Sequence, residues 1–276
     1  MVKSIFDLEK RTDLETEVAR LDSYLQQEVF IFYRGQYRGT FYNMVDSCFE
    51  LWPYRHTAIS MKQYFELLEL PTNTESYSDE ECMYYLQFIF DYIHWLYLKY
   101  REEFGNYKLK NRYFFDMCKR NSQYFATIQN NINIIAEMCN YKLELINSHM
   151  TFIKRDADVD SILKQLESED DLRLALLSYN DFRIENNVEE KRMILKKIGD
   201  WLEPKRSTYR QFNSNLTTDI FFLLNNAHIR HNNSNQLSLN SSEMLSIYDG
   251  LFKMMLHLIR TEDIKNIQNN ISKYKP

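Results

Sequence analysis

Two imidazoles and one guanidinium stand close together near the end of the chain, at His228, Arg230 and His231. A histidine side chain can take a proton from a ribose 2′-hydroxyl or return one to a leaving oxygen. A guanidinium can hold a phosphate through two hydrogen bonds and stabilise its developing charge. These residue types predict phosphate recognition or metal-independent RNA cleavage. The amides expected to orient the substrate are those of Asn226, Asn232 and Asn233.

A basic stretch leads towards this cluster. Between positions 191 and 210 only Asp200 and Glu203 are acidic, whereas the whole chain carries a formal charge of −5. The overall charge argues against a protein that coats nucleic acid without specificity, but a local patch can attract phosphates or an acidic partner. A solvated helix face is the plainer interpretation. The basic residues are Lys191, Arg192 and Arg210, together with the four expected to contact phosphate, Lys196, Lys197, Lys205 and Arg206.

A purely structural role for the cluster is an equally open alternative. Arg230 could bind carbonyl groups at a helix end, with His231 in the following loop. His228 and His231 could form half of a zinc site, but no cysteine or carboxylate completes it within that short stretch, so we expect no metal. The chain also has no nucleotide-binding or hydrolase motif, and we expect no cofactor.

The elements around the cluster are predicted to be helices. Apolar residues at positions 216, 220, 223, 224 and 227 follow helical spacing, so the cluster should lie at or just after a helix C-terminus. Asn240 and Glu243 have the spacing of a capping box, which predicts the start of the next helix. The apolar face of that helix comprises Met244, Ile247, Tyr248, Leu251, Met255 and Leu258.

The class predicted for the whole chain is all-α, a multi-helix bundle. Its 276 residues include only 5 glycines and 4 prolines, fewer than a turn-rich β fold needs. The helix at 78–104 is crowded with aromatic residues on every face, which favours a core element over a base-stacking surface. The run at 29–36 could end a helix or form a short strand. The other expected helices span 12–34, 37–52, 58–70, 111–153, 158–168, 170–179 and 188–202.

The composition becomes acidic after Arg155, which suggests two parts: a helical N-terminal region at 1–153 and a second helical domain at 154–276. The acidic 156–190 segment is predicted to form solvated helix faces or to hold a protein partner. The four cysteines are widely spaced, as in reduced buried thiols. No apolar run reaches the ~18 residues of a membrane span, so we expect a cytoplasmic protein without a membrane partner.

The run from Asn226 to Asn233, between two apolar helices, resembles the signature region of HEPN domains. These are all-α bundles, commonly dimeric, of bacterial abortive-infection, toxin–antitoxin and other RNA-cutting defence proteins. Arg230 matches the arginine of the family motif and His231 the polar residue after it. The later histidine of the motif is missing, because positions 235–237 read Asn-Gln-Leu. His228 or His231 would replace it, or the domain binds without cutting.

Two functions are therefore expected. The resemblance implies an RNA-directed defence or toxin-type protein, a homodimeric metal-independent endoribonuclease, with residues 154–276 as a HEPN-like bundle. Arg230 would grip the phosphate, and His231 or His228 would transfer the proton. The alternative is a non-catalytic helical binding module. It would hold RNA or a protein partner, such as an effector or an antitoxin, in a phage-defence or regulatory complex.

Overall fold

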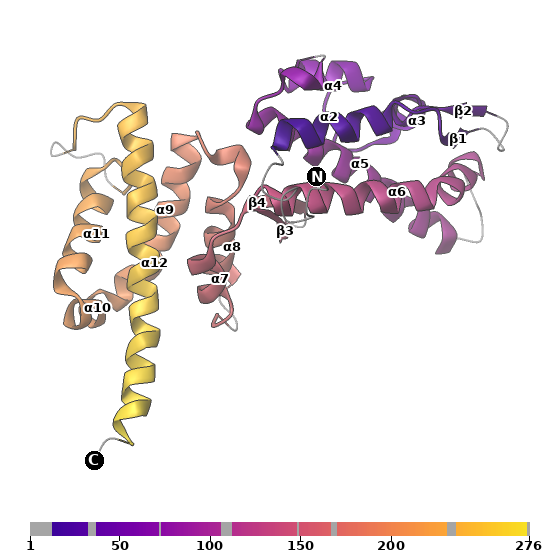
Figure 1. Cartoon of the computed structure of the whole chain (residues 1–276). Helices are drawn as coiled ribbons and strands as arrows, with labels where there is room; N and C mark the ends of the chain where they lie inside the picture. Colours follow the sequence, from indigo (N-terminus) through magenta and orange to yellow (C-terminus); the bar gives the residue numbers. More distant parts are fainter. Residues whose placement is uncertain are drawn as a thin grey trace, which may run out of the picture. The chain divides into compact units, whose positions relative to one another are not determined.

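The computed structural model describes residues 13–32, 37–71, 73–105, 112–147, 149–166, 170–230 and 236–274. The chain forms two compact units, Met1–Leu143 and Glu144–Pro276, and the division falls after Leu143 rather than after Ile153. Both units consist mainly of helices, as predicted, and Figure 1 shows each of them. The all-α prediction needs one correction, because the described residues also form two short sheets of two strands each.

The N-terminal unit is built on two long helices, α5 and α6, which pack against each other, while α2 packs against both. Its shorter elements lie around this framework. In chain order the elements are α2 (Leu14–Leu25), β1 (Phe30–Phe32), β2 (Tyr37–Gly39), α3 (Phe41–Cys48), η2 (Phe49–Leu51), α4 (Met61–Leu67), η3 (Thr74–Ser76), α5 (Asp79–Gly105) and α6 (Arg112–Met138).

The strand alternative for 29–36 is confirmed by β1, and the expected helix over 12–34 ends at Leu25. β1 pairs with β2 in antiparallel register, with Phe30 opposite Gly39. Aromatic and β-branched residues favour this pleated geometry, and here they outweighed the helical spacing. The next helix begins at Phe41 rather than at 37, because the Thr40 side chain caps it.

The aromatic helix α5 is a core element, as predicted. Tyr85, Phe88 and Tyr92 are buried on it. The Trp52 ring packs edge-on against Phe88 and Tyr92, with centroid distances of 5.4 and 5.6 Å. Edge-to-face contacts of this kind fix ring orientations as well as filling volume. The buried rings of α5 therefore do not offer a base-stacking surface.

The expected helix over 111–153 is wrong in its last third. α6 ends at Met138, and β3 (Tyr141–Ile146) and β4 (His149–Lys154) form a two-stranded sheet. Asn140 and Asn147 have positive φ angles of 64° and 49°. Asparagine tolerates this left-handed conformation, which a right-handed helix cannot pass through. The two asparagines thus end the helix and shape the turn between the strands.

The C-terminal unit is organised around α9, which packs against α8, α11 and α12. The predicted helix at 188–202 matches α9, and Asn187 caps it. The unit also contains β4 and the second half of β3. Its other elements are α7 (Ala157–Leu163), α8 (Asp170–Tyr179), η4 (Phe182–Ile184), α9 (Val188–Leu202), η5 (Glu203–Lys205), α10 (Arg206–Phe212), α11 (Ser214–Asn226) and α12 (Ser241–Ser272).

The capping box predicted at the start of α12 is confirmed. The Asn240 amide donates to Glu243 at 2.8 Å, and the Glu243 amide donates to the Asn240 side chain at 2.9 Å. The predicted apolar face of α12 supplies core residues, among them Tyr248, Leu251 and Met255, each with no exposed surface. In the described parts of the chain, no helix is long and apolar enough to cross a membrane.

Candidate functional site

Arg230 lies just beyond the C-terminus of α11, as the sequence predicted, but its side chain turns inward. Its backbone N–H donates to the Leu224 carbonyl at 3.0 Å, which folds the chain back over the helix end. The side chain is only 10% exposed. A phosphate in solvent therefore has little access to this guanidinium.

Two carboxylates hold the Arg230 guanidinium. Its Nη2 lies 3.3 Å from Asp200 Oδ1, and its Nη1 hydrogen-bonds to Glu203 Oε2. Both acids come from the end of α9 and the following η5, and they are the two acidic residues of the 191–210 stretch. The positive charge of Arg230 is thus matched by groups of the same unit.

An aromatic ring completes this arrangement. The Cζ atoms of Arg206 and Arg230 lie 4.3 and 5.5 Å from the centroid of the Phe221 ring. Arg206 Nη1 also lies 3.3 Å from Glu203 Oε1, so the two arginines share one carboxylate. The Nε atoms of both arginines and Nη2 of Arg230 are buried without a hydrogen-bond acceptor among the described residues. Cation–π contact with Phe221 is the compensation that the structure offers them.

Glu203 is held in its ionised form by this pairing. Burial raises the pKa of Glu203, but the hydrogen bonds and charges of Arg230 and Arg206 outweigh burial and lower the pKa from its usual 4.5. The net direction shows that the arginines dominate its environment. The ion pair between Arg230 and the ionised Glu203 links the loop after α11 to the chain that follows α9.

His228 fixes the same loop. It has a φ of 60°, and its backbone N–H donates to Gln236 Oε1 at 2.6 Å. Its ring Nε2 lies 2.9 Å from the Leu237 carbonyl oxygen. Because a carbonyl only accepts hydrogen bonds, Nε2 must carry a proton in this contact. The ring is half-buried, and its hydrogen bond to the Leu237 carbonyl fixes the position of the backbone there.

The structure brings Asn226 and His228 to the same helix end as Arg230, but Asn226 also bonds locally. Its side-chain amide donates to the Phe222 carbonyl at 2.8 Å, and its own carbonyl accepts from the Leu237 amide at 2.8 Å. The other residues of the predicted cluster, His231, Asn232 and Asn233, lie outside the described residues.

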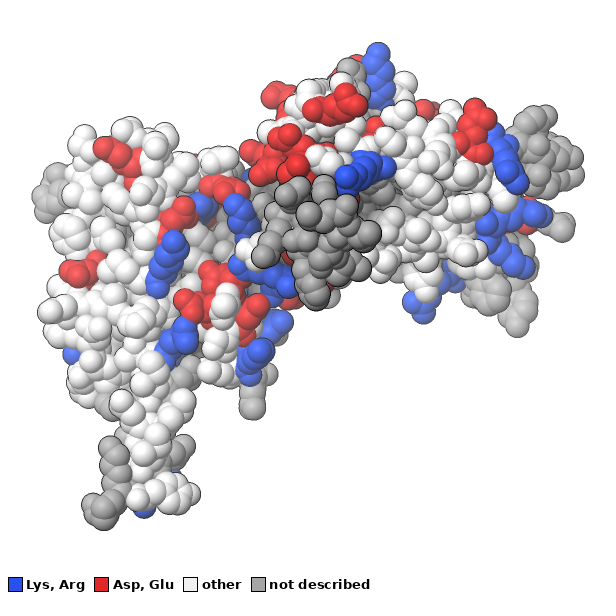
Figure 2. Space-filling view, viewed as in Figure 1, with Lys and Arg blue, Asp and Glu red and all other residues white. Residues whose placement is uncertain are grey.

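The basic stretch is divided between exposed and paired side chains. Lys196 and Lys197 are exposed on α9. Lys205 Nζ lies 3.8 Å from the Trp201 ring centroid and 3.8 Å from Glu262 Oε2, and Arg206 is shared with Glu203 as described. Lys191, expected on the outer face, is buried. On the face shown in Figure 2, the Lys and Arg side chains of this unit lie among Asp and Glu side chains.

Comparison with known proteins gave no match: no family model matches the chain, and no curated protein or solved structure is significantly similar to it. Across the residues that the structure describes, no group of three or more His, Cys, Asp or Glu side chains is arranged to hold a metal ion.

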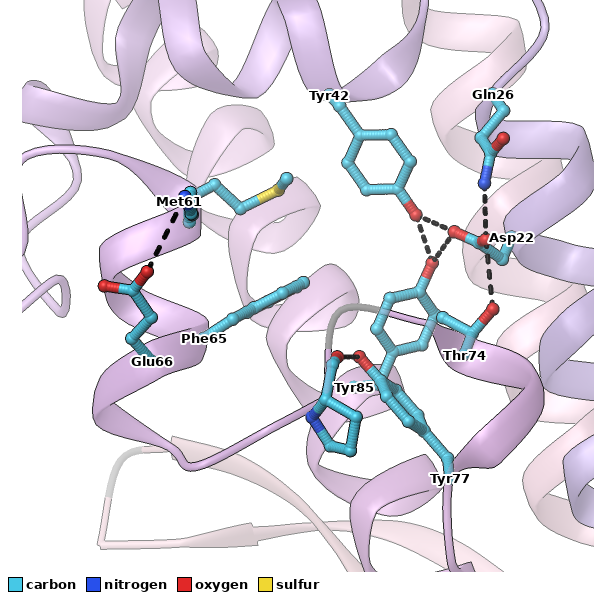
Figure 3. Close-up of a pocket in the computed structure, with 11 residues that line it drawn as sticks. Asp22, Gln26, Tyr42, Met61, Phe65, Glu66, Thr74, Tyr77 and Tyr85 are labelled. Atoms are coloured by element: carbon cyan, nitrogen blue, oxygen red, sulfur yellow. Dashed lines mark hydrogen bonds and ion pairs between the residues drawn. The ribbon is translucent and has the colours of Figure 1, made fainter.

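A second candidate site, which sequence reasoning missed, lies in the N-terminal unit around Asp22. This aspartate on α2 is only 8% exposed. Tyr85 donates to its Oδ1 at 2.7 Å, and Gln26 and Thr74 donate to its Oδ2 at 2.6 and 3.1 Å. Tyr42 also donates to Oδ1 and contacts the Tyr85 hydroxyl, as Figure 3 shows. The network joins α2, α3, η3 and α5.

A pocket of about 270 Å³ opens beside this network. Phe65 and Met61 of α4 form the side opposite Asp22 (Figure 3). The sequence does carry a signal for this site. Asp22 stands within the apolar stripe of its helix, four residues after Val18 and three before Leu25, both fully buried. A charged residue in a buried stripe needs polar partners, and the structure supplies them.

Proposed function

We propose that the protein is a non-catalytic helical binding module, and that its C-terminal helix α12 is the surface through which it associates. The observation that carries this proposal is the state of Arg230. Its guanidinium is nine-tenths buried and lies against Asp200 and Glu203. A group that stabilises charge in an RNA-cleaving transition state must direct its donors towards the reacting phosphate. Here Nη1 donates to Glu203 and Nη2 lies 3.3 Å from Asp200 Oδ1, so the charge of the guanidinium is opposed by two carboxylates of its own unit.

The ribonuclease function implied by the HEPN resemblance stays a prediction, as does a role in phage defence. The Nε2 atom of the His228 ring is engaged by the Leu237 carbonyl, which leaves Nδ1 of this ring for proton transfer. Lys196, Lys197 and Arg210 are the exposed cations of the basic stretch. Exposed cations on helix surfaces attract phosphates but do not transfer a proton to or from a ribose hydroxyl at neutral pH.

The end of α12 offers a binding surface of a recognisable kind. The helix runs beyond α10 and α11 within its unit (Figure 1). Three isoleucines and a tyrosine follow each other at intervals of three, four and three residues, which is coiled-coil spacing. Their exposures are 48% for Ile264, 58% for Ile267, 49% for Ile271 and 87% for Tyr274.

A second copy of the chain fits this stripe. Residues 268–270, between the two central isoleucines, are Gln, Asn and Asn, so two copies would bring no like charges together at the centre. In an antiparallel pair, Ile267 packs on Ile271 of the copy, and Gln268 lies opposite Asn270. Because each isoleucine is about half exposed, burying the rest of it is worth about 1 kcal/mol, so weak association at tens of micromolar protein is expected.

The oligomeric state tests this surface. Light scattering after size-exclusion chromatography should give a dimer at tens of micromolar protein, on the order of the expected dissociation constant. The double variant Ile267→Glu/Ile271→Glu should be monomeric. Met193→Glu, a matched change at an apolar side chain that is 49% exposed, should leave the dimer intact. A monomeric wild-type protein, or a dimer that survives the double variant, contradicts this assembly.

RNA cleavage tests the absence of catalysis separately. Purified wild-type protein incubated with a mixed RNA pool should leave the RNA intact, and Arg230→Ala should change the thermal stability of the protein rather than any activity. Lys196→Ala/Lys197→Ala serves as a control for loss of surface charge alone. RNA cleavage that Arg230→Ala abolishes, while circular dichroism stays native, would restore the ribonuclease function.

A further inference from the structure

The pocket beside Asp22 has a negative group at one side and aromatic rings around it. Its lining comes from α2, α3, α4, α5 and the η3 region, so five segments of one unit build it. Tyr77 and Tyr85 are 2% and 0% exposed, and Phe65 packs on Tyr85 with a centroid distance of 6.1 Å. Such a cavity has the mixture of apolar walls and few convergent polar groups that is typical of small-molecule sites.

No described cation pairs with Asp22. All of its side-chain partners, Tyr42, Tyr85, Thr74 and Gln26, are neutral. The pocket's one lysine, Lys62, is 78% exposed and lies 3.9 Å from Glu66 Oε1, so these two rim charges oppose each other. A buried carboxylate without a counter-charge raises the affinity of its surroundings for a positive ligand.

The polar atoms of the network converge at one point beside the pocket. The two tyrosine hydroxyls and Asp22 Oδ1 form three oxygen–oxygen contacts with one another, drawn as dashed lines in Figure 3. A hydroxyl oxygen and a carboxylate oxygen both have lone pairs that can accept an N–H group.

We propose that this pocket binds a small organic ammonium ion, whose N–H groups bond to the oxygens of Tyr42, Tyr85 and Asp22 while its carbon skeleton lies against Phe65 and Met61. Aromatic faces attract such cations in addition to burying their carbons. Burial, and next the charge of Asp22, raise the pKa of Tyr77 to about 12, which is consistent with a negative field in the pocket. The site is in the N-terminal unit and is independent of the assembly proposed for α12.

The charge of the ligand tests the proposal directly. Three probes share one skeleton: phenethylammonium, phenethyl alcohol and phenylacetate. In isothermal titration calorimetry with the full chain, the ammonium ion should bind at least about tenfold more tightly than the alcohol or the acid, a difference of about 1.4 kcal/mol or more. The trimethylated ammonium ion, which has no N–H, should bind more weakly than the primary one.

Variants assign the binding to Asp22. Asp22→Asn should weaken phenethylammonium binding by at least about tenfold. Asp116→Asn, at a surface aspartate of the same unit that pairs with Arg120, should leave it unchanged. If Asp22→Asn does not fold by circular dichroism, Phe65→Leu takes its place and should weaken binding several-fold.

Three results would overturn the proposal. The first is no saturable binding of phenethylammonium by the wild-type protein at millimolar concentration. The second is equal affinity for the alcohol, which would mean that the charge of the ligand is not recognised. The third is unchanged affinity in a folded Asp22→Asn or Phe65→Leu variant. Tighter binding of the trimethylated ion would also contradict recognition by the oxygens.

Discussion

The Lys191 ammonium lies 2.7 Å from the Asp249 carboxylate, although the Lys191 side chain is only 5% exposed. Tyr179 donates to the same carboxylate oxygen at 2.9 Å, and the ammonium lies 5.2 Å from the Tyr179 ring centroid. The ion pair joins α9 to α12 and is supported by α8. A lysine that the sequence places in a basic stretch is therefore part of the packing between helices.

Removing one partner of this pair should cost more than replacing the buried charge itself. Asp249→Ala leaves the Lys191 ammonium buried and unpaired, and should lower the free energy of unfolding by about 2 kcal/mol. Lys191→Met removes the charge and keeps the volume, and should cost less than about 1 kcal/mol. Urea unfolding followed by circular dichroism measures both. If the two variants lose the same unfolding free energy, the ion pair itself stabilises the protein, and the prediction is wrong.

Two glycines form a matched test of packing near Arg230. A Cβ atom at Gly199 would lie 2.8 Å from Leu224 Cδ2 and 3.3 Å from Arg230 Nη2, whereas one at Gly250 would meet nothing within 4 Å. Leu224 is fully buried and has little room to move. Gly199→Ala should therefore destabilise by about 1–3 kcal/mol, and Gly250→Ala should stabilise by up to about 1 kcal/mol. Melting temperatures of the two variants should shift in opposite directions.

Lowering the pH should remove the contribution of Glu203 to the free energy of unfolding. Its pKa is lowered in the folded protein, so its stabilising effect is present above the usual glutamate pKa of 4.5 and is lost as the pH falls through the lower folded value. The difference in unfolding free energy between wild type and Glu203→Gln should be constant near neutral pH and should shrink below about pH 4.5. A difference that is independent of pH would contradict an ionised Glu203.

The cysteines should differ in their reactivity. Cys48, Cys82 and Cys118 are buried, whereas Cys139 is partly exposed. Burial raises the pKa of both Cys82 and Cys118 to about 12, so neither is a thiolate at pH 8. A thiol reagent at pH 8 should label Cys139 first and the other three only after denaturation, as mass spectrometry of the peptides would show. Early labelling of Cys82 in native protein would contradict this burial.

Much of the helical framework follows from local sequence. The stripe from Ile194 to Leu202 and the capping asparagine before it define α9, since both signals act within a few residues. The Asn240–Glu243 capping box fixed the start of α12 for the same reason. The sequence leaves a strand open for 29–36, where β1 lies, but β3 and β4 are not predicted. A short run such as 141–146 is compatible with both helical and strand periodicity, and its pairing with a second strand decides between them.

The sequence by itself determined which residues gather at the end of α11 and that one helix of the N-terminal unit carries a charge in its apolar stripe. Only the tertiary structure decided what they do. Arg230 is a residue type that commonly binds phosphate. Its side chain turns inward because it pairs with Asp200 and Glu203, which lie about 30 positions earlier at the end of α9 and in η5. The partners of Asp22 come from three other segments, up to 63 positions away. Side-chain environment depends on such distant contacts, which no local pattern records.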